Sequence, residues 1–284
     1  MTVKVVSLNI EGDKHLAEVI GLIGRERPDL VCLQEVFEDD FKRFMGKFGM
    51  KGIFSPTVFI DKPGKPGFKK SGVFGVAMMG RLAGKFGAEY YFKRRGQDLP
   101  RYRGWPNAGH RTLVWQKIDN GPTVAATHFT WSKGGQATEK QRRELKKLMK
   151  LLVRIKPDIL CGDFNAPRGA RLRRGFGGQG EIWAKLAERF IDNIPAEIRT
   201  TLDQKLHYAN GMELVVDGFF TPAPRRVRGS AMPVNRHGFT LPKNDVQVIS
   251  LKLIGGVSDH LAIVAKLSIN VRGREELSTV NYGQ

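Results

Sequence analysis

The hydrophobic and polar positions at the start of the chain predict a strand, a helix and a second strand. Residues 3–9 (VKVVSLN) are mostly β-branched or apolar, which is typical of a buried strand. The segment 15–27 predicts a helix, because four apolar residues fall on one helical face: Leu16, Val19, Ile20 and Ile23. Pro28 ends this helix, and the apolar run 29–35 (DLVCLQE) predicts the next strand.

The rest of the chain consists of short apolar runs separated by Gly, Pro and Asn, with two helical patterns among them. The apolar runs predict strands at 73–79, 86–92, 111–118, 122–129, 158–163, 213–220, 246–253 and 261–269. Thr138 and Gln141 form a capping-box pattern that opens a long helix, whose apolar stripe is Leu145, Leu148, Met149 and Leu152. A shorter helix is predicted at 181–190. We therefore expect one α/β domain with two sheets over 1–270 and a flexible tail over 271–284.

The composition of the 284 residues is typical of a globular protein, with 41% hydrophobic and 26% charged residues. No apolar run approaches the ~18 residues that a membrane span needs, which excludes a transmembrane protein. The N-terminal segment has no small-residue cleavage site, so we expect a cytoplasmic protein without a secretory signal. Cys32 and Cys161 are too few for a disulfide framework, and we expect both to be small buried side chains.

The net charge narrows the choice of partner. The chain has 47 basic and 28 acidic residues, which gives +19. A surplus of this size favours nucleic acid, an anionic membrane surface or an acidic protein as partner. Most of the charge lies in four segments that we predict as loops, at 62–70, 93–111, 168–178 and 222–237. We expect these loops to bind the substrate through Arg94, Arg95, Arg101, Arg103, Arg111, Arg173 and Arg174.

Polar residues recur where the predicted buried strands end, and there they cost desolvation free energy unless another group compensates. At strand ends lie Asn9, Glu35, His128, Asp163 and Asn165, whereas Asp217 lies within a later strand, and Asp259 and His260 directly precede the last one. Each alone has an ordinary alternative, such as a turn cap, an ion pair with lysine or a hydrogen-bonded core histidine. Together they favour a divalent cation, and their carboxylate and amide oxygens are ligands that Mg²⁺ prefers. Zinc is disfavoured because His and Cys do not cluster at zinc-site spacings.

Six short motifs in these segments carry a family resemblance. They are SLNIEG at 7–12, LQE at 33–35, THF at 127–129, GDFNAP at 162–167, VVDGFF at 215–220 and SDH at 258–260. In this order they resemble the endonuclease/exonuclease/phosphatase superfamily, and its deoxyribonuclease I and 5′-tyrosyl-DNA phosphodiesterase branches more than its exonuclease III branch. The resemblance implies a metal-dependent phosphodiesterase with a four-layered α/β sandwich fold, in which two packed mixed β-sheets are flanked by helices.

The resemblance also implies a metal site. Glu35 looks like the main metal-binding carboxylate of the family, with Asn9 beside it. Asp259 is similar to a residue that assists the metal or the histidine in relatives. The implied cofactor is Mg²⁺, with Mn²⁺ as a substitute.

The remaining motif residues are implied to act on the phosphate. Asp163 resembles the group that orients or deprotonates the attacking water, and Asn165 resembles the amide that holds this water or a phosphoryl oxygen. His260 resembles the imidazole that contacts the scissile phosphate, and Asp217 resembles the carboxylate that orients it. His128 matches the second histidine of the deoxyribonuclease I and tyrosyl-DNA phosphodiesterase branches.

Three substrate classes are open within the family: nucleic acids, sphingomyelin-type lipids and inositol phosphates. Basic loops with few apolar residues favour nucleic acid over lipid, and their spread favours it over a compact inositol phosphate pocket. The apolar and aromatic side chains in these loops either stack on bases or anchor the loops to the core; they are Phe68, Tyr102, Trp105, Leu172 and Phe176.

We expect a monomeric DNA endonuclease or DNA-end-processing nuclease with no membrane partner. The alternative from another class is a nucleic-acid-binding protein without catalysis. It is disfavoured because the sequence keeps every motif residue that catalysis needs.

Overall fold

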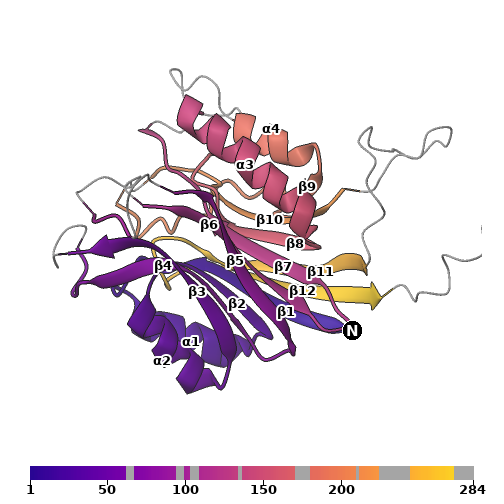
Figure 1. The fold of residues 1–284 in the computed structure, drawn as a ribbon, viewed down its shortest axis with the longest axis horizontal. Helices are drawn as coiled ribbons and strands as arrows, with labels where there is room; N and C mark the ends of the chain where they lie inside the picture. Colours follow the sequence, from indigo (N-terminus) through magenta and orange to yellow (C-terminus); the bar gives the residue numbers. More distant parts are fainter. Residues whose placement is uncertain are drawn as a thin grey trace, which may run out of the picture.

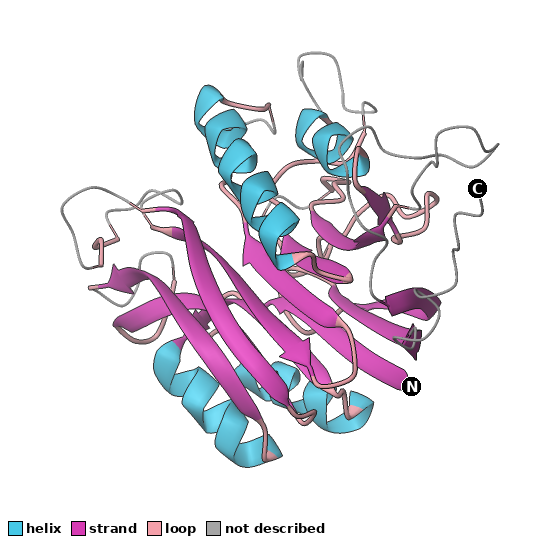
Figure 2. Ribbon diagram, turned by 45° about the vertical axis from the view of Figure 1, so that its right-hand side comes forward, coloured by secondary structure: helices cyan, strands magenta, loops and turns pink. Residues whose placement is uncertain are grey.

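The computed structural model describes residues 1–61, 67–93, 99–102, 109–133, 136–169, 180–208, 211–223 and 244–271. Two six-stranded sheets pack face to face, and helices cover their outer faces (Figure 1). Helices α1 (Leu16–Glu26) and α2 (Glu38–Phe48) cover one sheet, and α3 (Glu139–Ile155) and α4 (Glu181–Ala187) cover the other. The same four layers are visible in Figure 2. The expected four-layered α/β sandwich is therefore confirmed.

The first sheet has the strand order β11-β12-β1-β2-β4-β3. Its strands are β1 (Thr2–Asn9), β2 (Leu30–Phe37), β3 (Lys51–Ile60), β4 (Gly72–Gly80), β11 (Asn244–Ile254) and β12 (Ala262–Val271). Strands β1 and β2 are parallel and are joined by the crossover helix α1, whereas the other neighbours are antiparallel.

The second sheet has the order β5-β6-β7-β8-β10-β9. Its strands are β5 (Gly84–Phe92), β6 (Arg111–Ile118), β7 (Thr123–His128), β8 (Ile159–Asp163), β9 (Phe190–Asp192) and β10 (Asp217–Pro222). Strands β7 and β8 are parallel and are joined by α3. Thr138 caps this helix with the expected capping box.

The parallel pairs bring the polar strand ends together. The carboxyl ends of β1 and β2 lie at one edge of the first sheet, and those of β7 and β8 lie at one edge of the second. In the second sheet, His128 pairs with Asp163 across β7 and β8, and Asp217 opens β10 opposite Asp163. A core that is fully buried between the sheets holds these edges against each other and includes Val5, Cys32, Leu113, Ala126, Cys161 and Ala265.

The sequence did not predict α2, β3 or β9, and their residues explain why. Helix α2 (EDDFKRFMGKF) packs a regular apolar stripe, Phe41, Phe44, Met45 and Phe48, on the first sheet, but the charged residues that dominate the segment hid this stripe from the sequence analysis. Strand β3 contains Pro56, which is tolerated because β3 is an edge strand whose register shifts between Pro56 and Val58. The helix predicted at 181–190 ends at Ala187, and β9 follows it.

Several expectations concern residues outside the described ranges. These include most of the four basic loops and nearly all of the tail expected at 271–284, where only Val271 is described. None of the helices in the described part of the chain combines the length and apolar composition that crossing a bilayer requires.

Candidate active site

Asp163 lies at the centre of the polar cluster, at the end of β8, and its side chain is 1% exposed. Three donors hold its carboxylate: the Asn9 Nδ2 amide at 3.1 Å, the Asn165 backbone N–H at 2.7 Å and the Asn165 Nδ2 amide at 3.2 Å. Burial nevertheless raises the pKa of Asp163 to about 7. The carboxyl is therefore fixed in place and can exchange a proton near neutral pH.

Glu35 enters the cluster from the first sheet through an irregularity in β2. The pairing of β2 with β4 shifts register between Leu33 and Val36, and Glu35 has a φ of 55°. Such a bulge redirects a side chain, and non-glycine residues with positive φ are uncommon. Asn165 also has a positive φ, of 49°. Both cluster residues thus sit on strained backbone, as is frequent at functional sites.

The Glu35 carboxylate is more accessible than the carboxylates around it. Its side chain is 26% exposed, against 1% for Asp163 and 4% for Asp217. Burial, together with the negative charges of Asp259 and Asp163, raises the pKa of Glu35 to about 7. These carboxylates repel one another unless a cation or protons compensate.

His260 and Asp217 form a buried pair. The His260 Nδ1 and Asp217 Oδ2 atoms are 2.8 Å apart, so Nδ1–H donates to Asp217 and Nε2 faces Asp163 Oδ2 at 3.8 Å. Burial of the imidazole opposes its charged form, but Asp217, Asp163 and Asp259 outweigh this and hold the pKa of His260 well above its usual value. His260 is therefore a cation that can donate from both nitrogens.

His128 has the opposite electrostatics. Its Nε2 lies 3.5 Å from Asp163 Oδ2 and 3.7 Å from Glu35 Oε1. Burial, and then the positive charges of Arg111 and His260, lowers the pKa of His128 well below its usual value. The two imidazoles are thus driven apart in pKa, one charged and one neutral, which is the arrangement that acid–base chemistry uses.

A segment that the sequence analysis did not single out supports the cluster. Thr201 is fully buried, and its Oγ1 accepts the backbone N–H groups of Val216 at 3.0 Å and Asp217 at 3.1 Å. The Thr201 carbonyl accepts the Leu261 N–H at 2.7 Å. Thr201 therefore ties the Asp217 strand to the His260 loop. The only sequence signal was the run TTLD at 200–203, which has no motif character of its own.

An aromatic pair follows this segment and borders His260. The His207 ring lies 6.3 Å from the His260 ring and 4.4 Å from the Tyr208 ring, measured between centroids. Tyr208 is 83% exposed, and Leu206 and Met212 nearby are also exposed. An accessible aromatic surface thus lies next to the cationic imidazole. The sequence analysis did not predict it.

The donor chemistry of the cluster fits a divalent metal ion. Asp163, Asp217 and His260 offer ligand atoms that all lie within 4.8 Å of one another. On the other side of Asp163, the oxygens of Glu35, Asn9 and Asp259 are of the hard type that Mg²⁺ prefers. The Asp217–His260 hydrogen bond already engages two atoms of the first group, whereas the partly exposed Glu35 carboxylate is accessible to an ion.

The expected substrate-binding arginines are only partly described. Arg111 is buried and its Nε donates to Thr130 Oγ1 at 2.8 Å, so it faces the His128 end of β7 rather than open solvent. Arg101 is exposed, stacks over the Phe59 ring and pairs with Asp61 at 3.2 Å. Arg94, Arg95, Arg103, Arg173 and Arg174 lie outside the described residues. Their predicted contacts, like the roles of the cluster residues, stay predictions.

Of the aromatic side chains in the basic loops, Phe68 is an anchor. It is 3% exposed and packs against Phe37 and Phe74, with ring centroids 5.4 and 5.2 Å away. Tyr102 packs half-buried on the same cluster. Trp105, Leu172 and Phe176 lie outside the described residues.

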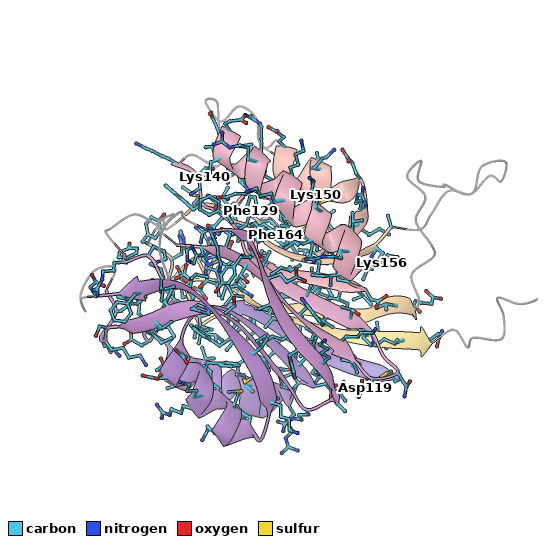
Figure 3. The ribbon with its side chains drawn as sticks, in the orientation of Figure 1. Asp119, Phe129, Lys140, Lys150, Lys156 and Phe164 are labelled. Carbon is cyan, nitrogen blue, oxygen red and sulfur yellow. The ribbon has the colours of Figure 1, made fainter. Side chains whose placement is uncertain are left out.

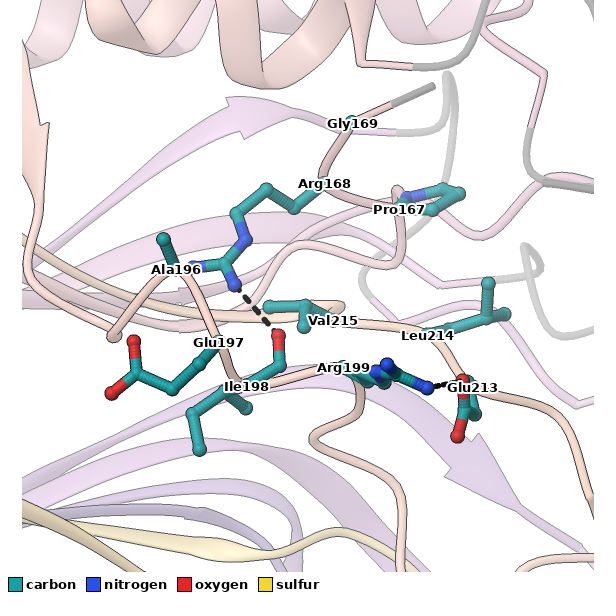
Figure 4. A pocket seen from close by; sticks show the side chains of 10 residues that line it. All are labelled: Pro167, Arg168, Gly169, Ala196, Glu197, Ile198, Arg199, Glu213, Leu214 and Val215. Carbon is teal, nitrogen blue, oxygen red and sulfur yellow. Dashed lines mark hydrogen bonds and ion pairs between the residues drawn. The ribbon is translucent and has the colours of Figure 1, made fainter. Parts of the chain in front are cut away.

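An open groove of about 800 Å³ lies along the chain segments that follow Asn165 and precede Asp217 (Figure 4). Arg168 lines it, but its guanidinium is already bonded to Asp192 and to the carbonyl groups of Ile194, Pro195 and Ile198. The other charged lining residues are Glu197, Arg199 and Glu213. Two acidic and two basic side chains balance, so the groove has no preference for a polyanion.

Comparison with known proteins places this cluster in a family context. The profile of the Endonuclease/Exonuclease/phosphatase family matches residues 6–260, a range that contains every cluster residue. No curated protein sequence matches the chain.

Solved structures share the fold at low sequence identity. An endonuclease/exonuclease/phosphatase from Bacteroides vulgatus is 16% identical with a TM-score of 0.62, and the match covers 95% of this chain and all of that one. The human Nocturnin catalytic domain, with a bound sulfate anion, is 16% identical with a TM-score of 0.60 and coverage of 95% and 94%. D. rerio TDP2 complexed with a single-strand DNA product is 16% identical with a TM-score of 0.55 and coverage of 94% and 99%. Because the family profile spans most of the chain, this protein belongs to the endonuclease/exonuclease/phosphatase family.

Proposed function

We propose that the protein is a Mg²⁺-dependent phosphodiesterase that hydrolyses DNA, as an endonuclease or an end-processing nuclease. The observation that carries the proposal is the connected set Asp217–His260–Asp163, with the accessible Glu35 carboxylate beside it. Phosphodiester hydrolysis requires an in-line nucleophile, compensation of phosphoryl charge and a stabilised leaving oxygen. This set provides a group for each requirement.

In this mechanism Asp163 orients the attacking water and accepts its proton, since its pKa near 7 suits a general base. The Asn165 side chain is held by Asp163 and by the Phe129 carbonyl at 3.1 Å, so its amide is preorganised beside the attack site. The His260 cation donates from Nε2 to a phosphoryl oxygen. Asp217 fixes the tautomer and orientation of the ring.

Glu35 would hold the Mg²⁺, with Asn9 and Asp259 beside it. Asn9 keeps its Oδ1 oriented by accepting the Glu11 backbone N–H at 3.1 Å. When bound, the ion supplies charge compensation for phosphoryl and leaving oxygens. Neutral His128 lies between Glu35 and Asp163 and can donate one hydrogen bond and accept another without carrying a charge. Burial keeps it neutral, together with the positive charges of Arg111 and His260, because they lower its pKa.

Two observations favour a nucleic acid substrate. The exposed Tyr208 ring lies against the His207 ring, which in turn borders His260, and it offers a stacking surface for a base. The predicted basic loops supply charge for the phosphate backbone. The fold neighbour D. rerio TDP2 was solved with a single-strand DNA product. Because lipid and inositol phosphate substrates carry the same phosphoryl chemistry, the test compares both with DNA.

The test is cleavage of a substrate panel by the purified protein with Mg²⁺ and with EDTA. The panel contains supercoiled plasmid, single-stranded DNA, abasic duplex, a 5′-tyrosyl DNA end, sphingomyelin vesicles and an inositol polyphosphate. We expect Mg²⁺-dependent cleavage of at least one DNA substrate. Faster hydrolysis of either non-nucleic substrate, or DNA binding without cleavage of any member, would overturn the proposal.

A further inference from the structure

Helix α3 presents a strongly basic outer face that the loop analysis overlooked. The helix contains seven basic residues and two acidic residues. One of the acidic residues, Glu144, is turned inward and buried. Apart from Glu139 at the first turn, every fully exposed position of α3 is basic: Arg142, Arg143, Lys146, Lys147, Lys150 and Arg154. Lys156 directly after the helix continues this face. We call these seven basic residues the α3 basic face.

Internal ion pairs account for only two members of the α3 basic face. Arg142 pairs with Glu181 at 2.8 Å, and Arg154 pairs with Glu89. The side chains of Arg143, Lys146, Lys147, Lys150 and Lys156 make no ion pair with any described residue. Their charges therefore do not serve the stability of the described fold.

Helix α2 shows that this is not a general feature of the helices. It covers the other sheet and mixes Glu38, Asp39 and Asp40 with Lys42, Arg43 and Lys47. A solvated helix surface of this mixed kind suffices for solubility. The one-signed surface of α3 therefore calls for a specific explanation.

The position of α3 connects its basic face to the candidate active site. The Gln141 Nε2 amide donates to the Thr130 carbonyl at 2.6 Å, which anchors the first turn just beyond His128. The helix connects β7 to β8 in the chain and therefore runs back across the outer face of the sheet. In Figure 3 it runs from Lys140 near Phe129 toward Lys156 at the far end. The basic face thus begins at the catalytic edge and leads away from it.

We propose that the α3 basic face binds the phosphate backbone of the nucleic acid substrate outside the catalytic edge. This inference rests on the proposed function for the identity of the polyanion. At 1.5 Å rise per residue, the thirteen steps from Arg143 to Lys156 span about 20 Å. Duplex DNA of that length carries roughly 12 phosphates, enough for every unpaired cation of the face to meet one. The face would add affinity for long substrates without reading their sequence.

A membrane surface is the competing polyanion, and the packing of α3 disfavours it. Membrane-surface helices bury an apolar face in the lipid. The apolar stripe of α3 is instead buried against the sheet, at Leu145, Leu148 and Leu152. The outer surface of α3 therefore offers a partner only charged side chains and no apolar face.

The test compares two charge-matched variants. The first carries Arg143→Ala, Lys146→Ala, Lys147→Ala and Lys150→Ala. Alanine preserves the helix. The control carries Arg25→Ala, Lys42→Ala, Arg43→Ala and Lys47→Ala on α1 and α2. Binding is measured by fluorescence anisotropy in EDTA against salt concentration, with labelled duplexes of roughly 30 and roughly 8 base pairs. Circular dichroism verifies that both variants are folded.

We expect the first variant to bind the long duplex at least ~10-fold more weakly than the control, with a salt slope shallower by up to about 3–4 units. The short duplex is about 27 Å long at 3.4 Å per base pair, so it still covers the ~20 Å face and should also bind the first variant more weakly. Equal affinities and slopes for the two variants would overturn the inference. So would a larger effect of the α3 variant on phosphatidylserine vesicles than on DNA. Because binding is measured without cleavage, an inactive protein would refute the proposed function and leave this comparison intact.

Discussion

Replacing Glu35 by Gln should stabilise the metal-free protein at alkaline pH. The Glu35 carboxyl has a pKa of about 7 in the fold, against 4.5 for the free group. The folded state therefore binds this proton more tightly than the unfolded chain does. The contribution of Glu35 to the free energy of unfolding is therefore largest below pH 4.5 and is lost as pH rises through about 7. In the Gln variant this loss does not occur.

The magnitude follows from the size of the shift. A difference of about 2.5 pKa units corresponds to roughly 3 kcal/mol, and the 26% exposure of the side chain reduces this through solvent screening. We expect Glu35→Gln to raise the free energy of unfolding by ~1–3 kcal/mol at pH 8 in EDTA. For a chain of this size that is several degrees in Tm. At pH 5, where most of the folded protein carries the proton, the difference should be small.

The assay is thermal unfolding of wild type and Glu35→Gln at pH 5 and pH 8, with EDTA or Mg²⁺. Mg²⁺ should stabilise the wild type by mass action and should affect the variant far less. Asp119→Asn is the control, because it removes an exposed carboxylate at the far end of β6 from the cluster. If Glu35→Gln is less stable than the wild type in EDTA at pH 8, or if Mg²⁺ shifts both proteins equally, the charge-repulsion argument is wrong.

Three further predictions concern turnover on the best DNA substrate. His260→Ala should lower kcat by about 10²-fold or more, and Asp217→Asn should show a comparable loss, because it removes the acceptor of His260 Nδ1–H; steady-state kinetics checks both, and near-normal rates for both variants would contradict the assigned pair. At sub-saturating Mg²⁺, kcat/KM should fall on the acid side of about pH 7, because protons then compete with the ion for Glu35 and its neighbours, and the fall should move to lower pH as Mg²⁺ is raised; a rate that stays flat down to pH 5 at low Mg²⁺ would contradict this. Tyr208→Ala should raise KM with little change in kcat, while Tyr208→Phe should behave like the wild type, because the ring and not the hydroxyl stacks on a base; a loss of kcat in both would place Tyr208 in the chemistry instead.

The sequence predicted the strands of the two parallel pairs and the helices that connect them, because those segments have strong apolar periods. Strand β1 and helix α1 have buried faces that their apolar spacing reveals. Helix α2 was missed although Phe41, Phe44 and Phe48 have helical spacing, because charged residues dominate its segment. Strand β3 was not predictable in this way, since it carries Pro56. The long-range sheet order depends on contacts that local patterns do not encode.

The cluster residues could be named from the sequence because each motif places a polar side chain at a strand end. What the sequence could not show is their electrostatics. His128 and His260 look alike in the sequence, and both are buried. Burial lowers the pKa of His128 with added effect from Arg111, whereas Asp217 and the other carboxylates around His260 outweigh burial and raise its pKa. The support from Thr201 and the surface at Tyr208 arise from tertiary contacts in a segment without a motif.

The placement of the basic residues on the surface is another feature that only the fold reveals. Counting residues by segment assigned the positive charge to loops and left the remainder nearly neutral. In that count, acidic residues outside the loops cancel the basic residues of α3. In the fold, most of these acidic residues lie on other elements or are buried, as Glu144 is. A nearly neutral scaffold therefore hides a basic face that only the burial pattern reveals.

The most direct test of the central claim is single-turnover cleavage of the best end-labelled DNA substrate of the panel by wild type and Asp163→Asn. The claim predicts that the wild type cleaves in Mg²⁺, stops in EDTA and recovers when Mg²⁺ is restored. It predicts that Asp163→Asn, folded as judged by circular dichroism, cleaves at least ~10²-fold more slowly. Equal rates for the two proteins in Mg²⁺, or undiminished cleavage by the wild type in EDTA, would contradict it.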